Sequence, residues 1–335
     1  MSELGRGGVN VIGFSPDKHD AIRSEITSRR LDERARTLER LRPATLTPEQ
    51  RMQATSVEQA TRDYLVGKLR RLGLPDDSLL AIPQVHYTIQ ERKKGDRQRA
   101  GDFDPVTNIT QVFDHRKSYD FFDMLSTIPH ESSHATVNRE AEYNFEDGAG
   151  PSVHSTGLEF IENHTLQGSG IEEAMVIFDE VDFFHSRLRE MFPDEYNKRR
   201  ALTTPGQLKE YGKIDQSLYG SFNPDHILPF VALYKPLPIG PVKIPIIKEA
   251  IKEYLFIRKL CEMVGRHTSP TITDPEEAVR VGRDILDKDR YLRIGEARRQ
   301  IIETLGEDNA SKIFQLGAHD GNIDTAMRVL VTAKK

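Results

Sequence analysis

The sequence predicts a mainly helical α+β protein, in which a small sheet with its own helices lies between helical N-terminal and C-terminal regions. Residues 1–80 and 271–335 carry apolar residues at helical spacing. Between them, residues 81–113 contain two runs rich in β-branched and aromatic residues, which is typical of strands. Helical spacing returns in residues 118–138 and 170–189, so helices follow the strands.

Three helices are expected in the N-terminal region. The first covers residues 21–41, where opposite charges fall between the apolar positions. Thr47 followed by Pro48 is a typical cap and first turn, so a second helix begins there. A third helix covers residues 57–72 and ends at Gly73.

Two strands are expected next. Residues 81–91 form the first, and Asp104 with Pro105 forms a turn that leads into the second. We expect the basic stretch at residues 92–99 to be a solvated loop rather than a phosphate site.

The helix expected over residues 118–138 contains Pro129. Because proline removes a backbone hydrogen bond, this helix is either kinked at Pro129 or begins near Thr127. Residues 141–170 are rich in glycine and are expected to form a loop, with one short strand-like piece at residues 156–162.

The C-terminal part begins with the most apolar stretch of the chain, residues 227–247, which two lysines and five prolines interrupt. A membrane helix needs about 20 mostly apolar residues, so we expect a buried irregular segment instead. A helix follows over residues 247–264, and Asp274 with Pro275 begins the final helical region.

Composition argues against several classes of function. The 335-residue chain has a formal net charge of −5, so neither nucleic acid nor an acidic membrane is expected as a partner. Cys261 is the single cysteine, which excludes an internal disulfide and a cysteine-based zinc cluster. Residues 1–20 lack the pattern of a signal peptide, and we expect a cytoplasmic protein.

Residues 130–134 read HESSH, which is an HExxH motif. On a helix, His130 and His134 share a face and can bind one Zn²⁺ at about 2.0–2.1 Å. Glu131 then lies beside the metal, where it can take a proton from bound water. A chance match is the alternative, but the apolar residues in 121–128 lead into the motif as expected for a buried helix.

The third ligand decides the class of metal site. A metzincin carries a histidine at the position of Glu140, and a more closely spaced site would need a histidine in place of Asn138. The candidates further along the chain are two histidines and four glutamates: His154, His164, Glu159, Glu162, Glu172 and Glu173. Spacing alone leaves all of them open.

Residues 170–174, GIEEA, resemble the second zinc helix of the gluzincin metallopeptidases, in which a glutamate before a small residue completes the site. The thermolysin-like form reads G-x-x-N-E-A, so the match implies that Glu173 is the ligand and that Glu172 takes the asparagine position. The order of elements over residues 81–190 is also similar to that of small gluzincins. The resemblance implies a zincin-like domain over residues 81–270, between the two helical regions.

The chain departs from the gluzincin pattern in two ways. Ile177 stands where thermolysin-like members carry an aspartate that orients a histidine, so Asp179, Glu180 or Asp123 would have to supply that carboxylate. The interval between the motif and the glutamate helix is also longer than in the best-known members, and we expect the inserted loop to shape or cover the substrate cleft.

Helical spacing also favours Glu173 over Glu172. In a helix that begins at Gly170, Glu173 shares a face with Ile177 and Glu180, and this face is expected to pack against the HExxH helix. Glu172 lies on a face that we expect to be partly exposed. Loss of Glu173 should therefore weaken zinc binding by several orders of magnitude, and loss of Glu172 should change it little.

Together these features predict a zinc-dependent peptidase with a peptide or protein substrate and Glu131 as the base. Residues 101–112 are a candidate edge strand for an extended peptide. The reaction also needs an oxyanion donor, and the candidates are Tyr211, Tyr219, His226, Tyr234, Tyr254 and His267.

Two other functions remain open. One is a non-catalytic zinc-binding interaction module, which Glu131 argues against because a purely structural site does not need a base. The other is a DNA-associated protease with His154 or His164 as the third ligand, which the acidic net charge argues against.

Overall fold

The computed structural model describes residues 8–12, 15–75, 84–89, 100–114, 121–137, 139–144, 151–202, 214–220, 228, 243–317 and 322–333. Within these ranges the protein is mainly helical with small sheets, as the sequence predicted. The basic stretch 92–99 and most of the segment 227–247 lie outside them. None of the described helices combines the length and the apolar character that crossing a bilayer requires.

Two long helices form the N-terminal part: α1, His19–Arg40, and α2, Pro48–Arg71. The predicted cap of α2 is confirmed, because Thr47 Oγ1 accepts a hydrogen bond from Gln50 N and the Gln50 side chain accepts one from Thr47 N. The prediction of two helices after residue 47 was wrong. The apolar positions on either side of the expected gap form one buried stripe on a single helix.

Three strands form a small sheet in the order β2-β4-β3: β2, Val85–Thr88, β3, Gly101–Asp104, and β4, Ile109–Phe113. Strand β2 runs parallel to β4, and β3 pairs with β4 as an antiparallel hairpin. The turn predicted at Asp104 and Pro105 connects β3 and β4. Among the described strands, β3 is therefore an edge of this sheet.

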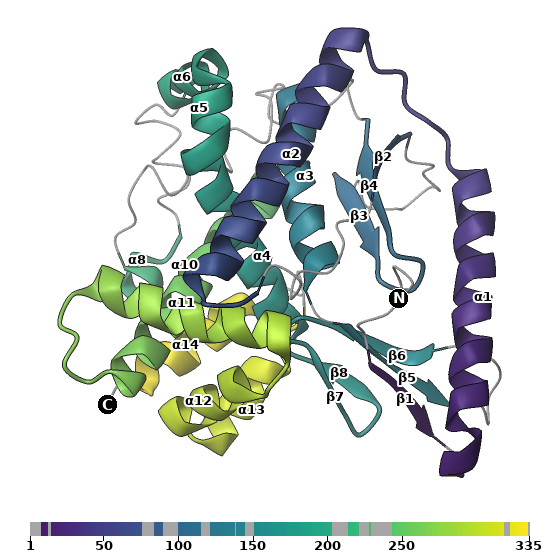
Figure 1. Cartoon of the computed structure of the whole chain (residues 1–335). Helices are drawn as coiled ribbons and strands as arrows, with labels where there is room; N and C mark the ends of the chain where they lie inside the picture. Colours follow the sequence, from purple (N-terminus) through teal and green to yellow (C-terminus); the bar gives the residue numbers. More distant parts are fainter. Residues whose placement is uncertain are drawn as a thin grey trace.

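A second sheet has the order β1-β5-β6, with β1, Gly8–Ile12, β5, Arg139–Asn144, and β6, Pro151–Thr156. A short hairpin follows, made of β7, Phe160–Glu162, and β8, Thr165–Gln167. The expectation of a loop over residues 141–170 was wrong, because most of its described residues belong to strands. Figure 1 shows α1 alongside both three-stranded sheets, at one side of the molecule.

The centre of the molecule contains α3, Phe121–Thr136, and α4, Ser169–Phe183. Helix α3 continues through Pro129, so it does not begin near Thr127. Helix α4 continues into a π-helical turn, Phe184–Leu188, and then into α5, Arg189–Met191, and α6, Pro193–Leu202.

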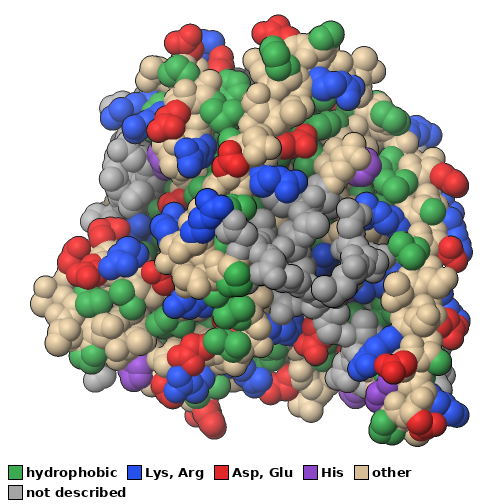
Figure 2. Space-filling view, in the orientation of Figure 1, with side chains coloured by type: hydrophobic (Ala, Val, Ile, Leu, Met, Phe, Trp, Pro, Cys, Tyr) green, Lys and Arg blue, Asp and Glu red, His purple; other side chains and the backbone are tan. Residues whose placement is uncertain are grey.

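The C-terminal part is helical, as predicted, and α11 begins at the predicted cap Asp274. It contains α8, Gln216–Tyr219, α10, Lys243–Thr268, α11, Pro275–Leu292, α12, Glu296–Leu305, α13, Glu307–Phe314, and α14, Ile323–Thr332. One hydrophobic core joins α4 to these helices, and a second joins α2 to β2, β4, α3 and the π-helical turn. Each of these cores therefore contains residues from more than one of the three regions expected from the sequence. On the face shown in Figure 2, acidic and basic side chains are interspersed.

Candidate metal centre

Helix α3 carries the two motif histidines on one face. His130 and His134 are one turn apart, and their ring centroids lie 5.3 Å from each other. Most of the helix around them is buried, including Ile128, which has no exposed surface. The core therefore fixes α3 and directs both imidazoles towards α4.

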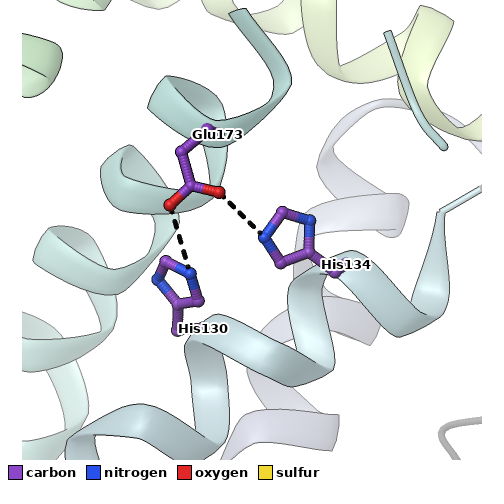
Figure 3. Close-up of side chains that lie close together, drawn as sticks. All are labelled: His130, His134 and Glu173. Atoms are coloured by element: carbon purple, nitrogen blue, oxygen red, sulfur yellow. Dashed lines mark ion pairs between the residues drawn. The ribbon is translucent and has the colours of Figure 1, made fainter. Parts of the chain in front are cut away.

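Helix α4 brings Glu173 to the same point, as Figure 3 shows. Its Oε1 lies 3.4 Å from His130 Nε2, and its Oε2 lies 3.2 Å from His134 Nε2. The predicted face is confirmed, since Glu173 and Glu180 both contact the motif histidines. Among the described residues, this is the group of three side chains that could hold a metal ion, and its ligand atoms all lie within 4.8 Å of one another.

The spacing and chemistry of this group fit zinc. Ligand atoms placed about 2.0–2.1 Å from a tetrahedral ion are about 3.3 Å apart, close to the two separations between Glu173 and the histidines. Two imidazole nitrogens and one carboxylate are also a known catalytic donor set for zinc, with one position left for water. Although burial lowers the pKa of His130, the carboxylates of Glu173 and Glu180 raise it well above its ordinary value, because they favour the positively charged form of the ring.

Glu180 orients His130. The Nδ1 atom of His130 lies 3.1 Å from Glu180 Oε2, which leaves Nε2 to face Glu173. Metal-binding histidines commonly donate their second ring nitrogen to a carboxylate, which fixes the tautomer and the ring plane. Of the three carboxylates considered for this role, Glu180 makes the contact, and Asp179 belongs to a buried ion cluster described below.

Glu131 lies beside the two histidines, with only 7% of its surface exposed. It faces strand β3, because a side-chain carbon at Gly101 would lie 2.6 Å from Glu131 Oε1. Burial raises the pKa of the Glu131 carboxyl to about 7, and His130 and His134 act in the opposite direction. A carboxylate with this pKa can both accept and release a proton near neutral pH.

Glu172 is not partly exposed, and that expectation was wrong. Only 1% of its surface is exposed, and both carboxylate oxygens accept hydrogen bonds from Arg290, the closest at 2.7 Å. Its Oε2 also accepts a bond from the backbone N–H of Leu158. Glu172 therefore points away from the histidines, and its loss would remove one of the carboxylates that pair with the buried guanidinium of Arg290. A Glu172 variant is for that reason unsuitable as a neutral control.

The other third-ligand candidates have different surroundings. His154 lies on β6 with its Nε2 atom 3.1 Å from Arg30, and His164 pairs with Glu142. Glu159 accepts bonds from the backbone and hydroxyl of Thr156. Glu162 pairs with Arg298 at the surface. None of these four belongs to the group around His130 and His134 in the described part of the chain.

Two of the oxyanion candidates make contacts in the C-terminal core. Tyr219 donates a hydrogen bond to Asp324, and Tyr254 packs edge-on against Phe178 in the C-terminal core. His267 is exposed near the end of α10. The remaining three, Tyr211, His226 and Tyr234, lie outside the described residues.

Sequence reasoning missed a buried ion cluster behind the histidines. It consists of Lys68, Glu172, Asp179, Arg283, Asp287 and Arg290, which come from α2, α4 and α11. Lys68 Nζ lies 2.6 Å from both Asp179 Oδ1 and Asp287 Oδ1. The sequence contains only a weak indication that these charged residues are buried. Lys68 stands next to the apolar Leu69, and Arg290 stands one turn after Leu286, but both helices are rich in charged residues, so neither position stands out in the sequence.

Comparison with known proteins gives no further guide to this site. No family model matches the chain, and no significant match was found among curated proteins or solved structures.

Proposed function

We propose that this protein is a zinc-dependent peptidase with a zincin-like core of the gluzincin type. The observation that supports this most is the convergence of His130, His134 and Glu173, with the buried Glu131 beside them. A purely structural zinc site is usually closed by four protein ligands. Here the described residues supply three, together with a carboxylate suited to acid–base chemistry.

In this proposal, His130, His134 and Glu173 hold the metal, and Glu180 keeps His130 in the orientation needed for binding. Bound zinc would lower the pKa of a water molecule and polarise the carbonyl of the scissile bond. Glu131 accepts a proton from the attacking water on its carboxylate. It then donates that proton to the nitrogen of the leaving amine.

The proposed substrate is an extended peptide that adds to strand β3. Two observations support it. Strand β3 is an edge of its sheet among the described strands, and Gly101 at its start lies against Glu131. A peptide paired with β3 would use backbone hydrogen bonds, which any sequence can make, so side-chain specificity would come from other contacts.

The test is peptide hydrolysis by the zinc-loaded wild type and by Glu131→Gln. The variant keeps the shape of the side chain and removes the base, so we expect unchanged zinc content and a loss of kcat of at least about a hundredfold. Glu190→Gln, at an exposed position on α5, is the matched control and should keep full activity. Equal turnover by wild type and Glu131→Gln would contradict the proposal.

A further inference from the structure

Ser133 connects the two helices that carry the candidate metal ligands. Its hydroxyl donates a 2.8 Å hydrogen bond to Asp179 Oδ2 on α4 and lies 3.3 Å from Nη2 of Arg290 on α11. Ser133 is fully buried, and Asp179 is 2% exposed. Solvent therefore does not compete for these bonds.

Arg290 holds α3 and α4 from behind the ligands. Its guanidinium contacts Ser133 Oγ, Glu172 Oε1 at 2.7 Å and Asp179 Oδ2 at 2.8 Å. Ser133 directly precedes His134, and Glu172 directly precedes Glu173. On each helix, a ligand therefore has a neighbour in the chain that is fixed to the same guanidinium.

The cluster is balanced in charge and almost completely dry. Lys68, Arg283 and Arg290 face Glu172, Asp179 and Asp287, and among these six side chains Arg283 has the largest exposed fraction, 11%. Buried ion pairs are often no more stabilising than apolar side chains of similar volume. Stability alone is therefore a weak reason for such a cluster, whereas a directional arrangement of this kind can fix the register of two helices.

From these contacts we infer that Ser133 is a positioning residue, which acts through Asp179 and Arg290 to fix the separation of the two metal-binding helices. The inference rests on the proposed metal site. A metal site tolerates ligand displacements of only about 0.2 Å, so a small shift between α3 and α4 would weaken binding. Helix α11 thereby contributes to the proposed metal centre without touching its ligands.

The neighbouring serine provides a matched control. Ser132 is 1% exposed and occupies the adjacent position of the same helix, but it takes no part in the bonds that link Asp179 and Arg290. Ser133→Ala and Ser132→Ala remove the same atom from equally buried sites. The Ser133 change is also mild, because Asp179 Oδ2 keeps its bond to Arg290.

The experiment measures zinc affinity by chelator competition and the visible absorption of Co²⁺ bound to the full-length protein. For Ser133→Ala we expect zinc affinity to fall by about 10- to 100-fold, as for other residues that support metal ligands, and the Co²⁺ bands to shift. Ser132→Ala should match the wild type. The melting temperatures of the two metal-free variants show whether any difference comes from general destabilisation.

Equal zinc affinities and Co²⁺ spectra for the two serine variants would overturn the inference. So would a weaker affinity of Ser133→Ala that its metal-free melting temperature fully accounts for. These results are distinguishable from failure of the proposed activity. If only the proposed peptidase activity fails, the wild type still binds zinc, but Glu131→Gln hydrolyses peptides as well as the wild type does. A wild type that binds no metal would overturn both.

Discussion

Gly101 belongs to the candidate site although it carries no reactive group. A methyl group there would lie 2.6 Å from Oε1 and 2.7 Å from Cγ of Glu131, and 2.8 Å from Cγ2 of Thr127. Side-chain carbons almost never approach other atoms so closely, so glycine is what allows β3 to pass directly beside Glu131. The proposed base, Glu131, and the proposed substrate strand, β3, can lie this close because Gly101 has no side chain.

In Gly101→Ala, the new methyl group is expected to displace Glu131, whose side chain is more flexible than that of Thr127. We expect kcat for peptide hydrolysis to fall on the order of a hundredfold, because a displacement of about 1 Å can have that effect. Zinc content should stay at the wild-type level, since no ligand is touched. Unchanged kcat at equal zinc content would show that Glu131 does not need this position.

At the residue scale, the sequence was informative where chemistry depends on spacing within one helix. His130, Glu131 and His134 could be found in this way, and so could the face shared by Glu173 and Glu180. The surroundings of Glu172 could not be predicted, because its partner is Arg290, 118 residues further along the chain. Helical periodicity shows which face a residue occupies, but it does not show what covers that face.

Two glycines set the contact between α10 and α11. A side-chain carbon at Gly282 would overlap the carbonyl of Cys261, and one at Gly265 would overlap the carbonyl of Ala278. The two helices therefore touch backbone to backbone. This contact matters for the candidate metal centre because α11 also carries Arg283 and Arg290.

The prediction at the scale of elements compares two glycine-to-alanine changes. Gly282→Ala pushes α11 away from α10 and should lower the free energy of unfolding by about 3 kcal/mol, because backbone atoms cannot move aside as a side chain can. At Gly67 on α2, no atom lies within 4 Å of the new methyl group. Gly67→Ala should therefore raise the free energy of unfolding by about 0.5–1 kcal/mol, because alanine favours the helix more than glycine does. Denaturant unfolding of both variants measures the difference. Equal stabilities would mean that α10 and α11 are not tightly packed.

Long helices with caps were the elements that the sequence predicted best. The caps at Thr47 and Asp274 mark the starts of α2 and α11, as expected. Strand β7 lies within the strand-like piece expected at residues 156–162, but β5, β6 and β8 were missed because each is short and polar, so the apolar alternation is weak. Such strands are stabilised by their partners, and β5 has partners on both sides, β1 and β6.

At the scale of the whole molecule, the three regions expected from the sequence are joined through the buried ion cluster behind the candidate metal site. Helix α2 supplies Lys68, the central part supplies Asp179, and α11 supplies Asp287 and Arg290 to one buried cluster. A change of composition along the chain marks where elements differ, but it does not show that separate cores exist. Helices α2 and α11, from the two ends of the chain, both pair with Asp179 on α4.

The central claim is that His130, His134 and Glu173 hold one zinc ion. Its most direct test is the zinc content of the purified chain after saturation with zinc and removal of free metal. We expect about one zinc per wild-type chain and far less in His130→Ala, His134→Ala and Glu173→Ala, because two remaining ligands bind weakly. Glu162→Ala, which changes an exposed surface carboxylate, should keep the full amount. Zinc retained in full by Glu173→Ala, or no zinc in the wild type, would contradict the account.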